Sequence, residues 1–135
     1  KINKPIDEVW DAIVNPDKIT KYFVSKASST IEAGKVIQWE FADYNVTIDI
    51  KIAKVVVNKS IKFSWDASRK MAEVEMLFSD NNENETAIEI TESAFDLTEA
   101  DIQKAMGQTQ GWTDFICSLK AYLYTGINLR NGKMN

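Results

Sequence analysis

Side chains that could perform catalysis are scarce in this chain. It contains no histidine, which removes the usual general base, the usual proton shuttle and the commonest metal ligand. A Ser-His-Asp or Cys-His arrangement is therefore impossible. A zinc site would have to use carboxylates and a single thiol, which is an unusual ligand set for zinc. The sequence therefore predicts no catalytic residues, no metal ion and no cofactor.

The carboxylates with the most regular spacing belong to Glu73 and Glu75. Residues two apart on a strand share one face of the sheet, and this pair alternates with Val74 and Met76. The apolar residues are expected to point inward, so the two carboxylates should face solvent, and Glu89 follows the same pattern. We interpret these residues as a solvated strand face rather than as an acid–base pair.

The only cysteine, Cys117, directly follows Ile116 in an expected C-terminal helix. It has no histidine and no obvious basic neighbour that would favour the reactive thiolate form. The sequence therefore predicts an inert, packed thiol. A single cysteine also excludes an internal disulfide, and with it a secreted scaffold held together by disulfides.

Composition places the chain among ordinary globular domains. Its 135 residues fit a single domain, 1–135, and its hydrophobic and charged fractions are 44% and 27%. The net charge is −4 and there is no basic run, which argues against nucleic-acid binding. No apolar run approaches the ~20 residues that span a bilayer, so no membrane insertion is expected. No signal peptide is visible, so a cytoplasmic location is predicted.

Two short helices are predicted near the start, in PIDEVWDAIVNPDKITKYF (residues 5–23). The first carries apolar residues with helical spacing, which places on one face Ile6, Val9, Trp10 and Ile13. Pro16 disfavours helical geometry at Asn15, so the first helix ends there, and Pro16 can begin the second. This break should form a corner that wraps the end of a curved sheet.

From about Ser25 to Ser93 the apolar residues recur with a period of two, which predicts about six strands joined by short turns. A weak alternation starts at Ala27, and the clearest comprises Val46, Ile48, Ile50 and Ile52. The polar run SDNNENE (79–85) is predicted to be a hairpin loop. Consecutive strands with short turns favour an antiparallel meander that has one apolar and one solvated face.

The C-terminal part is predicted to be helical in two pieces. A short helix should run to about Met106, and Gly107 and Gly111 should weaken the helical pattern after it. A longer helix with an apolar stripe should begin near Trp112 and end near Gly126.

This order of elements suggests a curved sheet that grips one long helix. It resembles the helix-grip fold of the START/SRPBCC superfamily, which includes birch-pollen-allergen-like proteins. Within it, the chain is similar to the homologues of the activator of the heat shock protein 90 ATPase, through the opening motif at 5–23, IKFSW (61–65) and GWTDFICSL (111–119). The resemblance implies an α+β fold with six or seven antiparallel strands around a long C-terminal helix, and two short helices after the first strand.

The resemblance also implies a cavity between the sheet and the C-terminal helix that binds a small apolar or amphipathic molecule, such as a lipid or an aromatic metabolite. Aromatic side chains and Met would give it a large apolar lining. The candidate lining residues are Tyr22, Trp39, Phe41, Ile48, Ile50, Phe63, Trp65, Met76, Phe78, Ile90, Trp112, Phe115 and Leu119, joined in the inward set by Phe23, Ile88 and Ile116. Each of these residues taken singly is also explained as ordinary core.

Three tyrosines, Tyr22, Tyr44 and Tyr122, could offer a hydroxyl to the head group of a ligand. Two other functions stay open at this point. One is a protein-interaction module that modulates a chaperone ATPase or a stress response. The other is an enzyme similar to polyketide cyclases, which would need a polar group pointing into the cavity. A protein partner or a homodimer is left open by the sequence.

Overall fold

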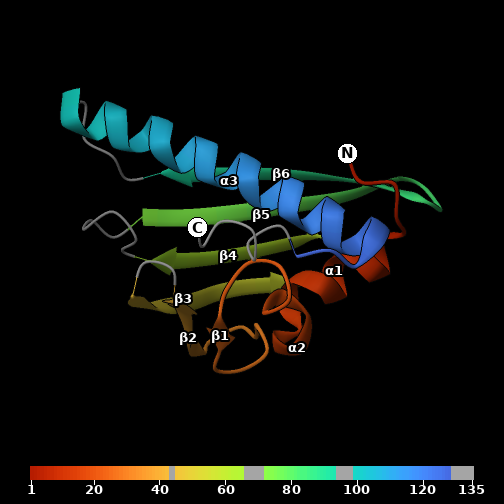
Figure 1. Cartoon of the computed structure of the whole chain (residues 1–135), viewed down its shortest axis with the longest axis horizontal. Coiled ribbons are helices and arrows are strands. Elements are labelled where there is room, and N and C mark those ends of the chain that lie inside the picture. Colours follow the sequence, from red (N-terminus) through yellow and green to blue (C-terminus); the bar gives the residue numbers. More distant parts are fainter. Residues whose placement is uncertain (43–44, 66–71, 94–98, 129–135) are drawn as a thin grey trace.

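A six-stranded antiparallel sheet and one long helix form the body of the molecule (Figure 1). The computed structural model describes residues 1–42, 45–65, 72–93 and 99–128. For residue 93 and residues 99–111 it describes the backbone but not the side chains. The elements are α1 (Ile6–Val14), α2 (Pro16–Ile19), β1 (Lys26–Ala27), β2 (Val36–Phe41), β3 (Val46–Val56), β4 (Ser60–Trp65), β5 (Ala72–Asn82), β6 (Glu85–Ser93) and α3 (Glu99–Thr125).

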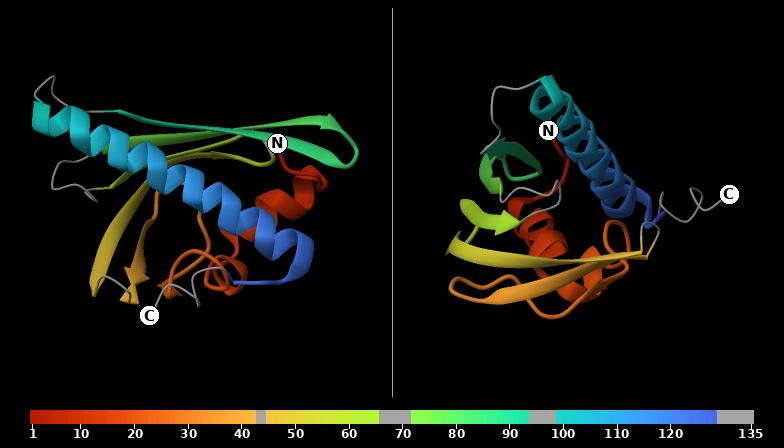
Figure 2. Two further views of the ribbon diagram at one scale, coloured as in Figure 1. Left: turned by 45° about the horizontal axis from the view of Figure 1, so that its top comes forward. Right: turned by 90° about the vertical axis from the view of Figure 1, so that its left-hand side faces the viewer.

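The sheet order β1-β2-β3-β4-β5-β6 makes the sheet a simple meander. The sheet curves, and α3 crosses its concave side while α1 and α2 close one end (Figure 2). This confirms the predicted α+β fold, in which a curved sheet grips a C-terminal helix. No helix in the described part of the chain is both long enough and apolar enough to cross a membrane.

The corner between α1 and α2 forms as the sequence predicts. Asn15 has extended backbone angles (φ −84°, ψ 119°), which is the geometry favoured before a proline. Its side-chain Oδ1 accepts a hydrogen bond from the backbone N–H of Asp17 at 2.9 Å and so caps α2. An ion pair between Lys18 and Asp11 links the two helices across the corner.

The strands place alternate residues on the concave side, as their period predicts. One inward row crosses four strands through the register pairs Ile52↔Phe63, Phe63↔Val74 and Val74↔Glu92. The first three of these side chains are buried. The row therefore runs from apolar residues in β3, β4 and β5 to a carboxylate in β6.

Two predicted element boundaries are corrected in the sheet. The loop expected over residues 79–85 is mostly strand, because β5 continues to Asn82 and β6 begins at Glu85. Polar side chains hold this tight hairpin together, since Asn81 donates to Glu85 at 2.8 Å and the Asn84 N–H donates to Asn82 Oδ1 at 2.9 Å. The weak alternation that begins at Ala27 yields a strand of only two residues.

The C-terminal helix is also longer than predicted. It runs unbroken from Glu99 to Thr125, through both Gly107 and Gly111. A glycine destabilises a helix by about 1 kcal/mol relative to alanine. The other interactions of a long helix can compensate for a loss of this size. The predicted end is confirmed, since Gly126 has a φ of +74° and its N–H donates to the carbonyl of Tyr122 at 2.8 Å.

The N-terminus extends the sheet beyond β6. Ile2 forms an isolated antiparallel bridge with Thr86, with hydrogen bonds of 2.7 and 2.8 Å in the two directions. Ile2 is buried and belongs to the main hydrophobic core. The first residues therefore pair with β6 in the place of a short first strand, as the fold resemblance implies.

Candidate functional site

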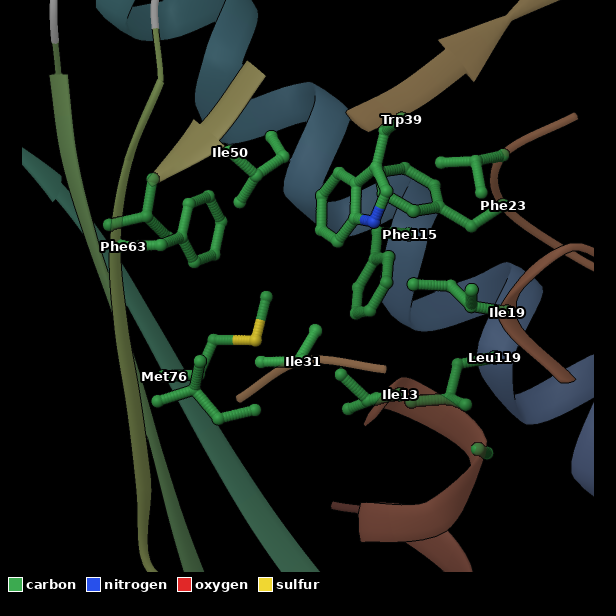
Figure 3. Packing of buried hydrophobic residues seen from close by; sticks show 14 of the residues in the cluster. Ile13, Ile19, Phe23, Ile31, Trp39, Ile50, Phe63, Met76, Phe115 and Leu119 are labelled. Carbon is green, nitrogen blue, oxygen red and sulfur yellow. The ribbon is translucent and has the colours of Figure 1, made fainter. Parts of the chain in front are cut away.

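A cluster of aromatic rings lies between the sheet and the middle of α3. We call it the aromatic cluster; its members are Phe23, Trp39, Phe41, Phe63, Trp65, Trp112 and Phe115. Figure 3 shows Phe23, Trp39 and Phe115 turned toward one another, with Phe63 on the side of the sheet. The rings come from β2, β4, α3 and the segment after α2, so the cluster joins two strands of the sheet to the corner segment and to α3.

Phe23 has a central position in this cluster. Its ring lies 4.7 Å from that of Phe115, 5.6 Å from Trp39 and 5.3 Å from Phe41, in each case edge to face. Such arrangements are the favoured geometry for aromatic pairs. Phe23 follows the corner helices α1 and α2. The corner formed by Asn15-Pro16 therefore positions this ring against the sheet.

Most of the predicted lining residues lie in the hydrophobic core. Phe41 and Ile90 are partly buried, and the buried ones are Tyr22, Trp39, Ile48, Ile50, Phe63, Trp65, Met76, Phe78, Trp112, Phe115 and Leu119. Their inward position follows the prediction, whereas their contact with a ligand remains a prediction.

Two predicted lining residues make ring contacts outside the aromatic cluster, and one of them, Tyr22, also borders it, since its ring centroid lies 5.9 Å from that of Phe115. The ring of Phe78 packs 5.0 Å from that of Trp10 on α1, edge to face. Tyr22 stacks on Tyr122, with ring centroids 5.4 Å apart, and its hydroxyl donates to the carbonyl of Ala12 at 2.9 Å. Because this donor is already used, Tyr22 is a poor head-group contact; Tyr44 lies outside the described residues.

Burial also changes the chemistry of Tyr22. The side chain is fully buried, which disfavours the charged phenolate and raises the pKa of its hydroxyl well above the usual value of about 10. The neighbouring Tyr122 adds a smaller effect in the same direction. Tyr22 is therefore a neutral structural group at physiological pH.

The carboxylate of Glu92 faces the concave side and contacts the aromatic cluster. Glu92 accepts a hydrogen bond from the indole N–H of Trp65 at 2.9 Å through Oε2 and from that of Trp112 at 2.8 Å through Oε1. The two indoles are stacked, with ring centroids 5.3 Å apart. The carboxylate is partly buried and joins β6 to both β4 and α3.

Sequence reasoning missed Glu92, although a signal for it existed. Thr86, Ile88 and Ile90 alternate on β6, and Glu92 is the next residue in that period of two. Its register partner Val74 is fully buried, which places Glu92 on the inward face. An acidic residue that continues an apolar alternation is therefore the pattern that would have identified it.

The carboxylates considered from the sequence lie on the opposite face, as predicted. Glu73 forms an ion pair with Lys62 at 3.3 Å, and Glu89 is exposed. The prediction for Cys117 is wrong, because its thiol is exposed rather than packed. Phe115 and Leu119 of α3 point into the core, and the residue at 117 lies on another side of the helix.

No group of three or more acidic or cysteine side chains that could hold a metal ion occurs among the described residues. Among these described residues, no lysine or arginine forms an ion pair with Glu92. Within the part of the chain that the structure describes, the concave side therefore offers a large aromatic surface and a carboxylate hydrogen-bonded to two of its indoles.

Comparisons with known proteins agree with this architecture. Residues 3–124 match the family model described as Activator of Hsp90 ATPase homolog 1-like protein. A crystal structure of a Staphylococcus saprophyticus protein is 30% identical, with a TM-score of 0.83 over 96% of this chain and 91% of that one. A search of curated proteins found no match.

Two further solved structures show the same fold at lower identity. The Aha1 dimer from Colwellia psychrerythraea is 21% identical, with a TM-score of 0.74 over 93% of this chain and 92% of that chain. DynU16, titled a putative protein in the dynemicin biosynthetic locus, is 24% identical, with a TM-score of 0.80. The match covers 93% of this chain and 45% of the DynU16 chain.

Proposed function

Because the chain belongs to the family of Activator of Hsp90 ATPase homolog 1-like proteins, we propose that it binds a small apolar or amphipathic molecule between the sheet and α3. The proposal is for binding without catalysis, in the cytoplasm. The observation that carries it is the aromatic cluster, which joins strands, corner segment and helix on one concave side.

The composition of this cluster favours an apolar or aromatic guest. Aromatic side chains offer large contact areas and bind other rings edge to face or offset. Phe23 and Phe115 come from segments that are distant in sequence, so a small shift of α3 would separate their rings without breaking the sheet. A lipid chain or an aromatic metabolite would then replace contacts that the rings now make with one another.

A second candidate function is the modulation of a chaperone ATPase through a protein surface. The description of the family supports it, and one structural neighbour is titled an Aha1 dimer. That neighbour is 21% identical, so it supports the fold and leaves the partner of this chain to experiment.

A third candidate is an enzyme similar to polyketide cyclases. Such an enzyme needs a polar group on the concave side, and Glu92 is a side chain that fits this requirement. Its carboxylate could act as a general base only with a substrate placed within hydrogen-bond reach. We rank this function below binding because the carboxylate is the only catalytic type of group that we identify beside the cluster in the described residues.

Native mass spectrometry of the freshly purified protein, followed by denaturing extraction, tests the binding proposal. We expect a stoichiometric extra mass that leaves on denaturation. The Phe23→Ala variant should lose this mass, because Phe23 touches four other rings. Leu77→Ala is the matched control, since Leu77 is 41% exposed on the outer face of the sheet.

A clean apo mass, with no uptake of added apolar probes, would contradict the binding proposal. The chaperone function would then be tested by a pulldown with purified heat shock protein 90 and by its ATPase rate in the presence of this chain. A stimulated ATPase rate would favour the second candidate.

A further inference from the structure

We propose that the Glu92 carboxylate recognises the positively charged head of a ligand whose apolar or aromatic body packs against the aromatic cluster. The ligand class is thus an organic cation, such as a primary amine on an aromatic or aliphatic body. This inference rests on the proposed function, because it names the kind of molecule that the same site would bind.

The first support is the way in which the carboxylate is held. Each oxygen of Glu92 accepts one indole N–H, from Trp65 at 2.9 Å and from Trp112 at 2.8 Å. A carboxylate can accept about four hydrogen bonds, two at each oxygen, and the two that the described residues donate use about half of this capacity. The two indoles therefore fix the orientation of the group and leave each oxygen able to accept a further donor.

The second support is the charge of the group. The indole donors are neutral, so they satisfy hydrogen bonds but do not balance a negative charge. Among the residues that the structure describes, none supplies a positive charge to Glu92. A partly buried carboxylate is stabilised by a counter-charge, which no described residue provides, and a bound cation would supply one through charge-assisted hydrogen bonds.

The third support is the position of Glu92 beside apolar side chains. It continues the inward row in which Val74 and Phe63 are fully buried, and Trp65 and Trp112 belong to the aromatic cluster. Apolar surroundings lower the local dielectric constant, which strengthens an ion pair formed there. A ligand with a charged head and an apolar body would match both parts of the site at once.

A purely structural role is the competing explanation. Glu92 also links β6 to α3 through Trp112, and this link alone would stabilise the fold. The two explanations differ in one measurable respect. A structural link predicts no preference for charge in a ligand, whereas recognition by the carboxylate predicts that cations bind more tightly than neutral molecules of the same shape.

The test compares three probes that share one apolar body, namely phenylbutylamine, phenylbutanol and phenylbutyrate. Binding to the full wild-type chain is measured by calorimetry and by the indole N–H signals in NMR spectra. We expect the amine to bind about tenfold more tightly than the alcohol, and the acid to bind more weakly than both. The indole signals of Trp65 and Trp112 should shift more on adding the amine than those of Trp10 and Trp39.

The Glu92→Gln variant then removes the charge and nearly preserves the shape. It should lower the affinity for the amine about tenfold relative to the affinity for the alcohol, so that the preference for the amine is lost. Glu89→Gln is the matched control, because Glu89 is an exposed carboxylate on the outer face of the same strand. That variant should bind all three probes as the wild type does.

Equal binding of amine and alcohol by the wild type would overturn this inference and leave the proposed binding function standing. Retention of the amine preference by folded Glu92→Gln would also overturn it. Failure of the wild type to bind any of the three probes, or the neutral dye Nile red, would overturn both proposals. The comparison of probes in the wild type decides the question even where Glu92→Gln does not fold.

Discussion

Glu92 on β6 accepts the indole N–H of Trp112 on α3 at 2.8 Å, and this hydrogen bond ties the long helix to the last strand of the sheet. The same carboxylate binds the indole of Trp65 on β4. One side chain thus links two strands and a helix. The two indoles that it binds are stacked, with ring centroids 5.3 Å apart.

Loss of this contact should weaken the fold measurably. Glu92→Gln leaves one amide N–H facing an indole N–H, so at least one partly buried donor loses its acceptor. We expect a decrease of about 1–3 kcal/mol in the free energy of unfolding. Urea denaturation followed by tryptophan fluorescence measures it. Equal stability of Glu92→Gln and the outward-facing control Glu89→Gln would contradict the structural part of this finding.

Phe115 should be one of the most sensitive positions on α3. Its ring is buried and lies 4.7 Å from Phe23 and 5.5 Å from Trp112. Phe115→Ala is expected to cost about 3–5 kcal/mol, because it removes the ring and leaves a cavity. Thermal unfolding measures this loss. Cys117→Ala is the control on the same helix, and we expect a change within about 0.5 kcal/mol because its thiol is exposed.

Tyr22 should contribute to stability in a pH-dependent way. Burial raises the pKa of its hydroxyl in the folded state, so the folded state favours the neutral form. The contribution is therefore complete below about pH 10, the ordinary pKa of tyrosine, and decreases as the pH rises above it. Tyr22→Phe cannot ionise and lacks this decrease.

The measurement is urea denaturation of the wild type and Tyr22→Phe at about pH 8 and about pH 11. At the lower pH we expect the variant to be about 1 kcal/mol less stable, because the hydrogen bond to Ala12 is lost. At the higher pH this difference should shrink or reverse. A difference that does not change with pH would show that Tyr22 does not titrate with a raised pKa.

Asn15 should stabilise the corner that positions Phe23. Asn15→Ala removes the acceptor for the N–H of Asp17, and we expect a loss of about 1 kcal/mol. Asn15→Asp keeps an acceptor at the same position and should retain most of the stability. Guanidinium denaturation of the two variants tests this, and equal losses in both would argue against the capping role.

The local pattern of the sequence was enough to predict most of the fold. Pro16 restricts the backbone of its neighbour whatever surrounds it, so the corner at Asn15 is visible in the sequence. The period of two predicts the strands and their inward faces, because side chains alternate along any strand. The positive φ of Gly126 ends α3 where the sequence predicts.

Only the tertiary structure decided where distant side chains meet. The helix α3 continues through Gly107, although glycine locally disfavours a helix. The β5–β6 hairpin is longer than the polar sequence of its loop predicts, because side chains such as Asn81 and Glu85 bond across it. The hydrogen bonds of Glu92 with Trp65 and Trp112 depend on how the sheet curves and where α3 crosses it. Periodicity fixes the face on which a side chain lies, whereas its partner on another element is set by packing in three dimensions.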